Sequence, residues 1–325
     1  MSGASEARSE PKASGATRPE ARSEPKASEE HRVGFIGTGT IGAPMAKRLL
    51  DAGHLLVVCD RVEAATGPLV EAGATRAASP REVAAACRVV FTSLPGPREV
   101  EEVATGKDGL LAGAQAGDIH VDLSTSAFEA VRALAAREAA AGVQLVDAPV
   151  SGGVMGAAQG TLTVMASGER AAFERVEKLL GAFGKNIFYL GESGNGTLTK
   201  LVNNAIFLCG GLLVQETFAM AAKAGLDPNR LLEVVQKSSG AAYAGMAKLL
   251  LGRGFDNAFF QLALAEKDVG LAVASAQGLG VRMPVIEAAH ATYARALAMG
   301  LGPKLFAATL LAVEEAAGVE VPPLS

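Results

Sequence analysis

Short apolar runs alternate with longer segments of mixed polarity through the first two thirds of the chain. The apolar runs have the length of buried β-strands and lie at residues 33–36, 55–59, 88–94, 118–123, 143–147, 162–166 and 186–190. Helical periodicity appears between them at residues 63–72, 127–141 and 171–180, and Gly96-Pro97 opens a further helix. Strands that alternate with helices predict an α/β fold with a parallel, doubly wound sheet.

The pattern changes after Gly196, where no further strand is predicted. Residues 198–316 read as helix, with breaks near 226–228, 238–240, 252–257, 278–284 and 300–303. We therefore expect two domains, a doubly wound domain over residues 31–193 and an all-α domain over residues 194–325. A ligand site is expected in the cleft between them, where such sites concentrate.

The first thirty residues have a different character. The segment EARSEPKAS occurs at residues 6–14 and again, unchanged, at residues 20–28. No core-forming residue follows Met1 in this stretch, so it cannot bury enough apolar surface to order itself. It also lacks the apolar core of a secretory signal. We expect a disordered tail over residues 1–30 that has no part in the chemistry.

A glycine-rich turn follows the first predicted strand. It is a Gly-x-Gly-x-x-Gly motif made of Gly37, Thr38, Gly39, Thr40, Ile41 and Gly42. Such a turn lets the backbone approach a pyrophosphate, which the free N–H groups of the following helix then bind. The motif alone is weak in a chain with 38 glycines, but its position between a strand and a helix is specific. We expect these six residues to bind a dinucleotide in a Rossmann-type domain.

Asp60 ends the second predicted strand, and Arg61 follows it. A carboxylate at this position accepts hydrogen bonds from the adenosine ribose and repels a 2′-phosphate, which favours NAD. Arg61 would have the opposite effect by pairing with that phosphate. We therefore predict NAD as the cofactor, with NADP as the alternative. A solvated turn is the simpler interpretation of the pair, and it applies more to Arg61 than to Asp60.

One predicted helix carries polar side chains where apolar ones are expected. Residues 198–215 are almost continuously apolar, but Lys200, Asn203 and Asn204 interrupt them on one helix face. A buried amine and two buried amides are costly unless they are paired. A lone lysine would more simply reach water from a helix end. The two asparagines beside it favour a ligand site.

Composition and charge are those of a two-domain enzyme without a nucleic-acid or membrane partner. The 325 residues are nearly half hydrophobic, and the formal net charge is −4. The longest unbroken apolar runs are too short to span a bilayer. Cys59, Cys87 and Cys209 match no metal motif and indicate core packing in a reducing compartment, so we expect a cytoplasmic protein and no metal site. None of the histidines is given a role: His31, His54, His120 and His290.

Four motifs together carry a resemblance to a known family. They are the loop over residues 34–42 with Ala43, Pro44 and Met45; the run Asp147-Ala148-Pro149-Val150-Ser151-Gly152-Gly153 followed by Gly160-Thr161-Leu162; Gly194-Asn195-Gly196 with Lys200, Asn203 and Asn204; and Lys267-Asp268. In this order they cover nearly the whole chain after residue 31. The sequence thereby resembles the β-hydroxyacid dehydrogenase family, whose members include 3-hydroxyisobutyrate dehydrogenase and tartronate semialdehyde reductase.

The resemblance implies roles for individual residues. Ser151, Gly152 and Gly153 match the loop that holds the substrate carboxylate, and a Ser-Gly-Gly turn exposes backbone N–H groups suited to an anion. Lys200 matches the catalytic lysine, and Asn204 an asparagine that contacts substrate, while Asn203 supports the network. On the cofactor side, Leu94 and Pro95 would pass the adenosine ribose, Thr125 would lie near the nicotinamide, and Lys267 would reach the cofactor. Simpler alternatives are an ordinary turn for Ser151–Gly153, a surface position for Lys267, and a helix N-cap for Thr125, Ser124 or Ser126.

The implied reaction is hydride transfer between a nicotinamide and a small carboxylate-bearing hydroxyacid or its semialdehyde. A free lysine has a pKa of about 10.4, and burial together with a nearby nicotinamide cation would lower it toward the range of a useful base. We expect a homodimer or homotetramer assembled through the helical domain. Two alternatives stay open: a reductase of short aldehydes, glyoxylate or imines on the same scaffold, and a non-catalytic dinucleotide-binding module. Lys200 argues against an imine reductase, because such enzymes usually lack this lysine. A non-catalytic module would tolerate the loss of Lys200 or of Ser151-Gly152-Gly153, and all of these residues are present.

The sequence departs from the family pattern at two places. Met165-Ala166-Ser167-Gly168 stands where the family usually has Met-Val-Gly-Gly, which we interpret as a harmless turn variant. Leu305 and Ala307 replace an aspartate and a serine that often open the last helix, so this helix is expected to lose its cap. The second departure bears on the substrate rather than on the reaction.

Overall fold

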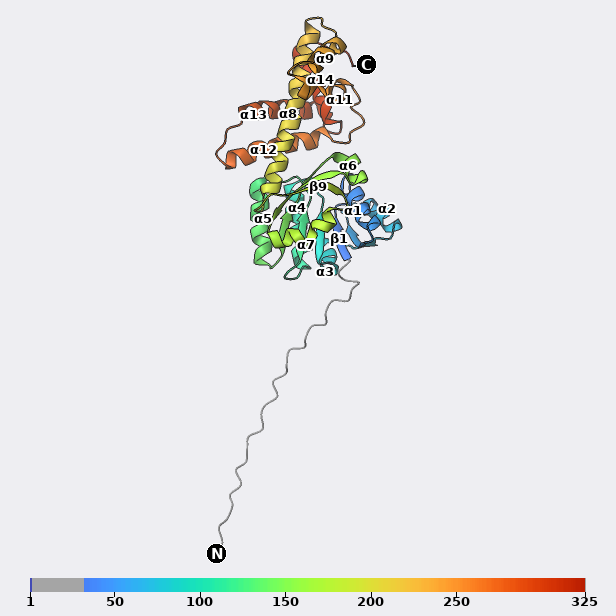
Figure 1. Ribbon diagram of the computed structural model, residues 1–325, viewed down its shortest axis with the longest axis vertical. Helices are drawn as coiled ribbons and strands as arrows, with labels where there is room; N and C mark the ends of the chain where they lie inside the picture. The colour runs from blue at the N-terminus through green and yellow to red at the C-terminus, as the bar shows by residue number, and fades with distance from the viewer. Residues whose placement is uncertain (2–31, 325) are drawn as a thin grey trace.

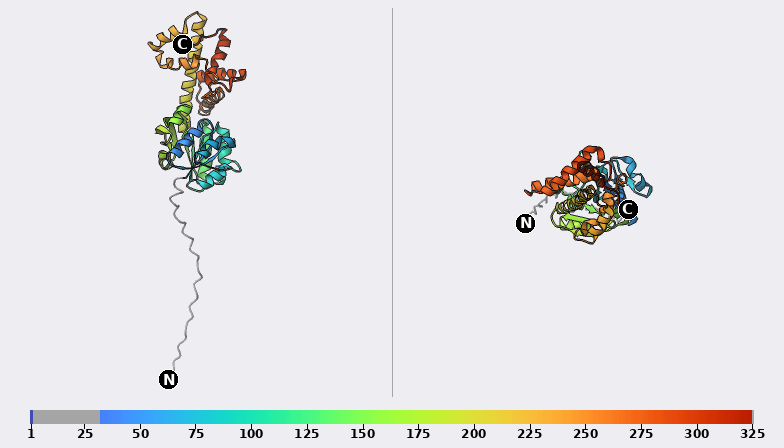
Figure 2. Two further views of the ribbon diagram at one scale, coloured as in Figure 1. Left: turned by 90° about the vertical axis from the view of Figure 1, so that its right-hand side faces the viewer. Right: turned by 90° about the horizontal axis from the view of Figure 1, so that it is seen from above.

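The computed structural model describes Met1 and residues 32–324, and it consists of two lobes stacked along the long axis of the molecule (Figure 1). A mixed α/β lobe comes first in the chain, and a lobe of helices follows it. The view turned by 90° shows the same separation (Figure 2). The predicted tail, apart from Met1, lies outside the described residues.

The sheet of the first lobe is parallel through six strands and then turns antiparallel. Its strands are β1 (Arg32–Ile36), β2 (Leu55–Cys59), β3 (Thr75–Arg76), β4 (Val89–Thr92), β5 (Ile119–Asp122), β6 (Gln144–Asp147), β7 (Val150–Ser151), β8 (Leu162–Gly168) and β9 (Gly184–Tyr189), in the order β3-β2-β1-β4-β5-β6-β8-β7 with β9 paired to β8. The order reverses between β1 and β4, and ligands of doubly wound sheets bind at such a switch point. Strand β8 runs antiparallel to β6, a difference from the predicted parallel sheet. A parallel return needs a long crossover, and the helix between them has only seven residues.

Helices cover both faces of this sheet. They are α1 (Gly42–Asp51), α2 (Gly67–Glu71), α3 (Pro80–Ala86), α4 (Pro97–Thr105), α5 (Phe128–Ala140), α6 (Gly153–Gln159) and α7 (Arg170–Leu180), with short helices η1 (Glu63–Thr66) and η2 (Leu110–Ala112). Phe91 lies at the centre of the core, and its ring centroid is 6.0 Å from those of Phe35 and Phe183. The predicted α/β doubly wound architecture is confirmed, while α3, α6 and the short strands β3 and β7 were not predicted.

The second lobe is built around one long helix. Its helices are α8 (Asn195–Lys223), α9 (Pro228–Gln236), α10 (Ala241–Ala244), α11 (Ala247–Leu251), α12 (Leu262–Gly278), α13 (Pro284–Ala296) and α14 (Thr309–Ala317), with η3 (Leu297–Leu301) and η4 (Phe306–Ala308). The predicted breaks fall between these helices. Helix α8 rises from the sheet lobe through the whole helical lobe and packs on α12, α14 and α11 (Figure 1). Buried Gln215 fixes it by donating to the carbonyls of Leu250 and Ala307 and accepting from Thr309 Oγ1.

Helix α8 is longer and more apolar than the sequence pattern indicated. By length and composition alone this helix could cross a membrane. This differs from the expectation that the apolar runs of the chain are too short to span a bilayer. Polar residues interrupt both ends of the helix, so its unbroken apolar run covers only residues 205–214, although its mean hydropathy is high. More than half of its most apolar window (56%) is buried within the protein. A core helix of the second lobe accounts for that burial.

The start of α8 is tied to the sheet by Asp147, the last residue of β6. Asp147 Oδ1 accepts hydrogen bonds from Gly194 N (2.9 Å) and Ser167 Oγ (2.7 Å), and Oδ2 accepts one from Thr197 N (3.0 Å). The carboxylate thereby satisfies N-terminal amides of a helix that has no side-chain cap of its own. Gly194 has a φ of 96°, a conformation that favours glycine. The sheet lobe therefore sets the position of the helix that carries Lys200.

Ser167 belongs to this junction, which corrects the interpretation of residues 165–168 as a turn variant. The segment lies in strand β8, and Ser167 is fully buried. Its hydroxyl donates to Asp147 and accepts a hydrogen bond from Gly196 N at 2.8 Å. The hydroxyl therefore bridges the sheet and the first turn of α8, a contact that glycine could not make.

Candidate active site

A cavity of about 690 Å³ lies between the two lobes. Its walls include eleven of the residues singled out in the sequence: Thr40, Ile41, Leu94, Pro95, Thr125, Ser151, Gly152, Gly153, Lys200, Asn204 and Lys267. They come from the ends of β1, β4 and β5, from the segment after β6, and from helices α8 and α12. The fold thus brings together residues that are up to 227 positions apart, from Thr40 to Lys267.

The glycine-rich turn has the shape that a dinucleotide requires. Gly37 has a φ of 90°, and a Cβ there would overlap the carbonyl oxygen of Ser93. A Cβ at Gly42 would overlap the carbonyl oxygen of Gly37. Gly39, in contrast, has no atom within 4 Å of its Cβ position, so its backbone faces open space. Helix α1 starts beside it with no acidic residue in its first turn and no side-chain cap, which leaves its N-terminal dipole free for a phosphate.

Asp60 is fixed against this turn. Its Oδ2 atom accepts a hydrogen bond from Thr38 N at 2.7 Å, and Oδ1 accepts one from Val62 N at 2.8 Å. Asp60 is half-buried, whereas Arg61 is exposed, and neither lines the cavity. The solvated-turn alternative therefore does not describe Asp60, because its carboxylate braces the glycine-rich turn.

Lys200 is buried in α8, with 9% of its surface exposed. Burial lowers the pKa of its amine; the charge of Asp268 opposes this effect, and Lys267 adds to it. Among the residues that the structure describes, no hydrogen-bond or ion-pair partner is found for its Nζ atom. Most of its side chain is covered by the protein, unlike that of a helix-end lysine that extends into water. An unpaired amine with a lowered pKa on a cavity wall is suited to take up or release a proton.

The two asparagines differ from each other. Asn204 is buried, and its Nδ2 atom donates to Asp268 Oδ2 of α12 at 2.7 Å. Asn203 is exposed, which corrects the expectation that all three polar residues are buried, and it donates to Asn204 Oδ1 at 3.1 Å. The supporting position predicted for Asn203 agrees with this contact.

Asp268 received no role from the sequence, although it belongs to the fourth motif. It is buried, it lines the cavity, and it holds Asn204 while its charge acts on Lys200. Lys267 Nζ lies 3.0 Å from its Oδ1 atom as an ion pair, without the geometry of a hydrogen bond. Asp268 could have been identified from the sequence, because an acid at a buried position of an apolar helix indicates a functional or paired residue.

Lys267 joins the helical lobe to the sheet lobe. Its Nζ atom donates to the carbonyl oxygen of Pro95 at 2.7 Å and to that of Thr125 at 3.2 Å. Pro95 follows β4 and Thr125 follows β5, so one ammonium group spans both loops. The alternative of a free surface lysine is therefore wrong.

Thr125 lines the cavity and does not cap a helix. The N-cap residue of α5 is Ala127, which has no side-chain cap, and Phe128 N donates to Ser275 Oγ of α12 at 3.4 Å. Ser124 Oγ accepts a hydrogen bond from Leu94 N at 2.9 Å. The N-cap alternative for residues 124–126 is therefore wrong.

The Ser151-Gly152-Gly153 segment forms another wall of the cavity. Gly152 and Gly153 have φ values of 130° and 64°, so both lie in the region that favours glycine. No atom lies within 4 Å of the Cβ position of Gly153, which leaves its backbone open to the cavity. The exposed N–H groups of these two glycines can receive an anion.

Leu305 and Ala307 do not lie in the cavity wall. Both are buried in the core of the helical lobe. Helix α14 begins after Ala308, which provides no side-chain cap, as the sequence predicted.

Comparisons with known proteins agree with this geometry. Residues 32–191 match the NAD binding domain of 6-phosphogluconate dehydrogenase, and residues 194–313 match the NAD-binding family of NADP-dependent 3-hydroxyisobutyrate dehydrogenase. The chain is 36% identical to 2-(hydroxymethyl)glutarate dehydrogenase of Eubacterium barkeri, over 89% of this chain and 97% of that one. It is 38% identical to 3-hydroxyisobutyrate dehydrogenase of Pseudomonas aeruginosa, over 78% and 88% of the two chains.

A solved structure shows the same architecture. The Mycobacterium tuberculosis 3-hydroxyisobutyrate dehydrogenase with L-serine superposes with a TM-score of 0.78 at 29% identity, covering 86% of this chain and 98% of that one. The chain therefore belongs to the β-hydroxyacid dehydrogenase family and is an NAD(P)-dependent oxidoreductase that acts on hydroxyacids.

Proposed function

We propose that this enzyme interconverts a small β-hydroxyacid and its semialdehyde, with Lys200 as the general acid and base. The observation that carries the proposal is the buried, unpaired amine of Lys200 in the inter-lobe cavity, with its pKa lowered by burial. A lysine near its ordinary pKa of about 10.4 is a poor base at neutral pH. Lowering that value makes the neutral amine available, and a well-placed base contributes about 10²–10⁴-fold to the rate.

Separate residues would transfer the proton, orient the substrate oxygen and bind the substrate carboxylate. Lys200 takes the hydroxyl proton when the alcohol is oxidised and returns it when the aldehyde is reduced. Asn204, held by Asp268, orients the substrate oxygen, and the backbone N–H groups of Ser151–Gly153 hold the substrate carboxylate. When bound, NAD(P) supplies the hydride acceptor or donor.

Residues of the sheet lobe would bind the cofactor. The turn over Gly37, Thr38, Gly39, Thr40, Ile41 and Gly42 would hold the pyrophosphate, because Gly39 and the start of α1 leave room and positive potential for it. Asp60 would bind the ribose and favour NAD over NADP, with Arg61 opposing it. Leu94, Pro95 and Thr125 would flank the nucleotide, with Lys267 bracing the two loops that carry them.

The cavity favours a substrate with one carboxylate and a small apolar group. Phe207, Phe259 and Met155 supply an apolar wall, and among the described residues that line the cavity the basic ones are Lys200 and Lys267. Lys200 is assigned to the proton and Lys267 is engaged with backbone carbonyls. A second carboxylate on the substrate would therefore lack a cation to pair with it.

We also propose a homodimer or homotetramer formed through the helical lobe. Four apolar residues of α8 are 51–70% exposed: Val202, Ile206, Leu213 and Met220. Their spacing of four and seven residues places them on one helix face, and such exposed stripes mark protein interfaces. Replacing Ile206 with glutamate should convert the oligomer to a monomer in light scattering; a monomeric wild type would contradict the proposal. The three unpaired cysteines support a cytoplasmic, reducing location.

The proposed reaction is tested by initial rates with a panel of short hydroxyacids and semialdehydes, each with NAD(H) and NADP(H). The panel should include matched mono- and dicarboxylates, and a cyclic imine. We expect the highest kcat/KM with a monocarboxylic β-hydroxyacid and NAD(H). Turnover of the imine without turnover of any hydroxyacid would contradict the proposal.

A further inference from the structure

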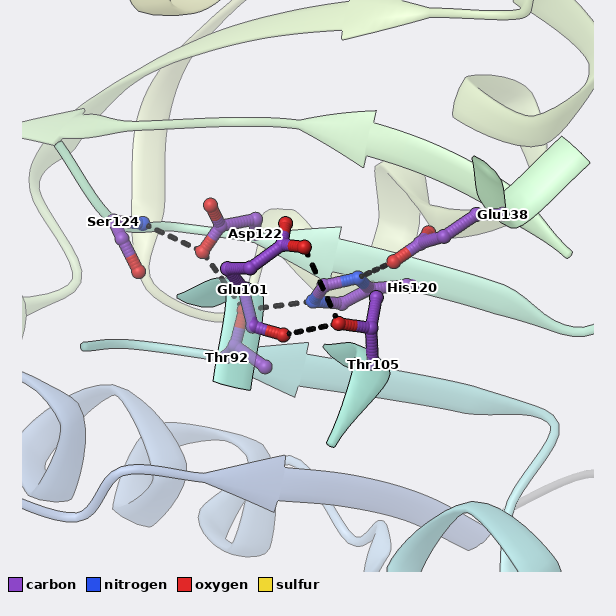
Figure 3. Close-up of polar contacts among 7 residues, drawn as sticks. All are labelled: Thr92, Glu101, Thr105, His120, Asp122, Ser124 and Glu138. Atoms are coloured by element: carbon purple, nitrogen blue, oxygen red, sulfur yellow. Dashed lines mark hydrogen bonds and ion pairs between the residues drawn. The ribbon is translucent and has the colours of Figure 1, made fainter. Parts of the chain in front are cut away.

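A buried network of polar side chains lies within the sheet lobe and reaches the cavity wall only at Ser124 (Figure 3). Its centre is His120 of β5, whose Nδ1 atom lies 2.7 Å from Glu138 Oε1 of α5. Both side chains have no exposed surface. No sequence motif assigned a role to either residue, and the proposed reaction does not use either.

The network leads from this pair to two loops of the cavity. His120 Nε2 lies 2.8 Å from Thr92 Oγ1, which donates to Asp122 Oδ1 at 2.8 Å. The same carboxylate oxygen accepts from Ser124 N at 3.1 Å, and Ser124 Oγ accepts from Leu94 N at 2.9 Å. Thr92 ends β4 and Asp122 ends β5, so the contacts run from the core to both segments that follow these strands (Figure 3).

The hydrogen bonds of the pair fix how many protons it holds. Thr92 has one hydroxyl proton, and it goes to Asp122, because a carboxylate can only accept. His120 Nε2 must then carry a proton to donate to Thr92. Nδ1 faces the carboxylate of Glu138, and that contact also needs a proton. The pair therefore holds one proton more than a neutral imidazole beside a carboxylate, and that proton lies between His120 Nδ1 and Glu138 Oε1.

The surroundings agree with this count. Burial alone would lower the pKa of His120, but Glu138 and Asp122 outweigh it, so the pKa is raised. The neighbours of His120 on the adjacent strands, Val90 and Leu145, are apolar. Glu101 of α4, also drawn in Figure 3, is partly exposed and pairs with Arg137. The charged groups that act on His120 are therefore Glu138 and Asp122.

A buried pair of this kind is weak evidence for stability. Removing two charges from water is costly, and apolar residues of similar volume often serve the core as well or better. Among the described residues, Glu138 Oε2 has no hydrogen-bond partner, so the pair is not fully compensated. A role in positioning the loops that the network reaches would explain why the pair is present.

We propose that His120 and Glu138 are positioning residues for cofactor binding. The pair orients the Thr92 hydroxyl, Thr92 and Asp122 fix Ser124, and Ser124 fixes the backbone of Leu94. The segments at Leu94-Pro95 and at Thr125 are thereby held in one geometry before the dinucleotide arrives, which avoids an ordering cost on binding. Lys267 braces the same two segments from the other lobe.

Two substitutions separate the contacts of His120. In His120→Gln the side-chain amide nitrogen can replace Nε2 and still donate to Thr92, whereas in His120→Asn it replaces Nδ1 and reaches only Glu138. The dissociation constant for NADH or NADPH, whichever binds more tightly to wild type, is measured by nucleotide fluorescence, with the melting temperature alongside. We expect His120→Asn to weaken binding about tenfold and His120→Gln about twofold or less, with kcat at saturating cofactor within about twofold of wild type in both.

The chain offers a matched control in His290, which pairs with Glu266 at 2.9 Å on the surface of the helical lobe. His290→Gln should leave cofactor affinity unchanged. Equal affinities for the Asn and Gln variants of His120, at comparable melting temperatures, would overturn the proposal, because a purely structural role would not distinguish them.

Glu138→Gln provides a second test of the positioning role if His120→Asn does not fold. Glutamine keeps an acceptor for His120 Nδ1 but removes the charge that raises the pKa of His120. The pH at which cofactor affinity falls, as His120 loses its proton, should therefore move lower than in wild type. An identical pH dependence of the dissociation constant in both proteins would overturn the proposal.

Discussion

Asn204 Nδ2 of α8 donates a 2.7 Å hydrogen bond to Asp268 Oδ2 of α12. This contact links the proposed substrate-orienting amide to the carboxylate whose charge acts on Lys200. The two residues are 64 positions apart, and their contact forms only when both helices pack in the second lobe. Substitution of Asp268 therefore tests what sets the pKa of Lys200.

Asp268→Asn should lower kcat and shift the pH dependence of oxidation. Asp268 raises the pKa of Lys200 against the effect of burial, so its removal lowers that pKa further. Oxidation needs the neutral amine, and the rise of kcat/KM with pH should therefore begin at a lower pH. We expect kcat to fall by roughly tenfold or more, within the range of acid–base effects. A shift of the rise to higher pH would contradict the assigned charge effect.

Asp147→Asn should destabilise the junction between the lobes. Asparagine has one side-chain acceptor oxygen, whereas Asp147 receives three donors through two oxygens. A buried donor left without a partner costs about 1–3 kcal/mol. Chemical denaturation should show a loss of that size. Ser167→Gly, which removes the bridging hydroxyl but keeps the carboxylate, should cost less, and the opposite ranking would contradict Asp147 as the main anchor.

Asp60→Ala should reduce the preference for NAD. The carboxylate sits against Thr38 N, where a ribose hydroxyl could reach it and where a 2′-phosphate would be repelled. We expect wild type to have a higher kcat/KM with NAD(H), and the variant to narrow or invert the ratio. Arg61→Ala is the companion variant and should widen it. A wild-type preference for NADP(H) of tenfold or more would show that Arg61 dominates.

Lys200→Met should stabilise the fold while removing activity. Because the pKa of Lys200 is lowered in the folded state, the unfolded state binds more protons between that value and about 10.4. The free energy of unfolding of wild type therefore rises with pH across this window, and the variant should lack the rise. At neutral pH the apolar methionine should melt at a higher temperature than wild type. A lower melting temperature would indicate that the lysine contributes to stability.

Local patterns in the sequence were sufficient for the parts of the fold that depend on local structure. The glycine-rich turn, the alternation of strands and helices, and the helix breaks after Gly196 all follow from short-range periodicity and turn residues. Helix α3 had a usable local signal as well, since Ser79 accepts a hydrogen bond from Glu82 N and Pro80 opens the helix. The reversal of β8 had none, because it depends on how far the short helix α6 can carry the chain.

The candidate site also combines residues that a local pattern identifies with residues that only the packed structure identifies. The position of Lys200 in an apolar helix could be identified from residue types and spacing, and the Ser151-Gly152-Gly153 segment from the resemblance to the family. Asp147 as a remote cap, Ser167 as a bridge, and the link from His120 to Leu94 could not, because each joins residues far apart in the chain. Motifs marked Asp147 and Asp268 without assigning their functions, which became apparent only from their partners in the packed structure.

If Lys200 moves the proton, Lys200→Ala removes the group on which turnover depends. The measurement is kcat with the preferred hydroxyacid, together with the dissociation constant for the cofactor. We expect kcat below a tenth of the wild-type value, in line with general-base effects, and nearly unchanged cofactor affinity, because the proposed role of the amine concerns the substrate and not the pyrophosphate. Retention of more than about a tenth of the wild-type kcat would contradict the assignment of Lys200 as general acid and base.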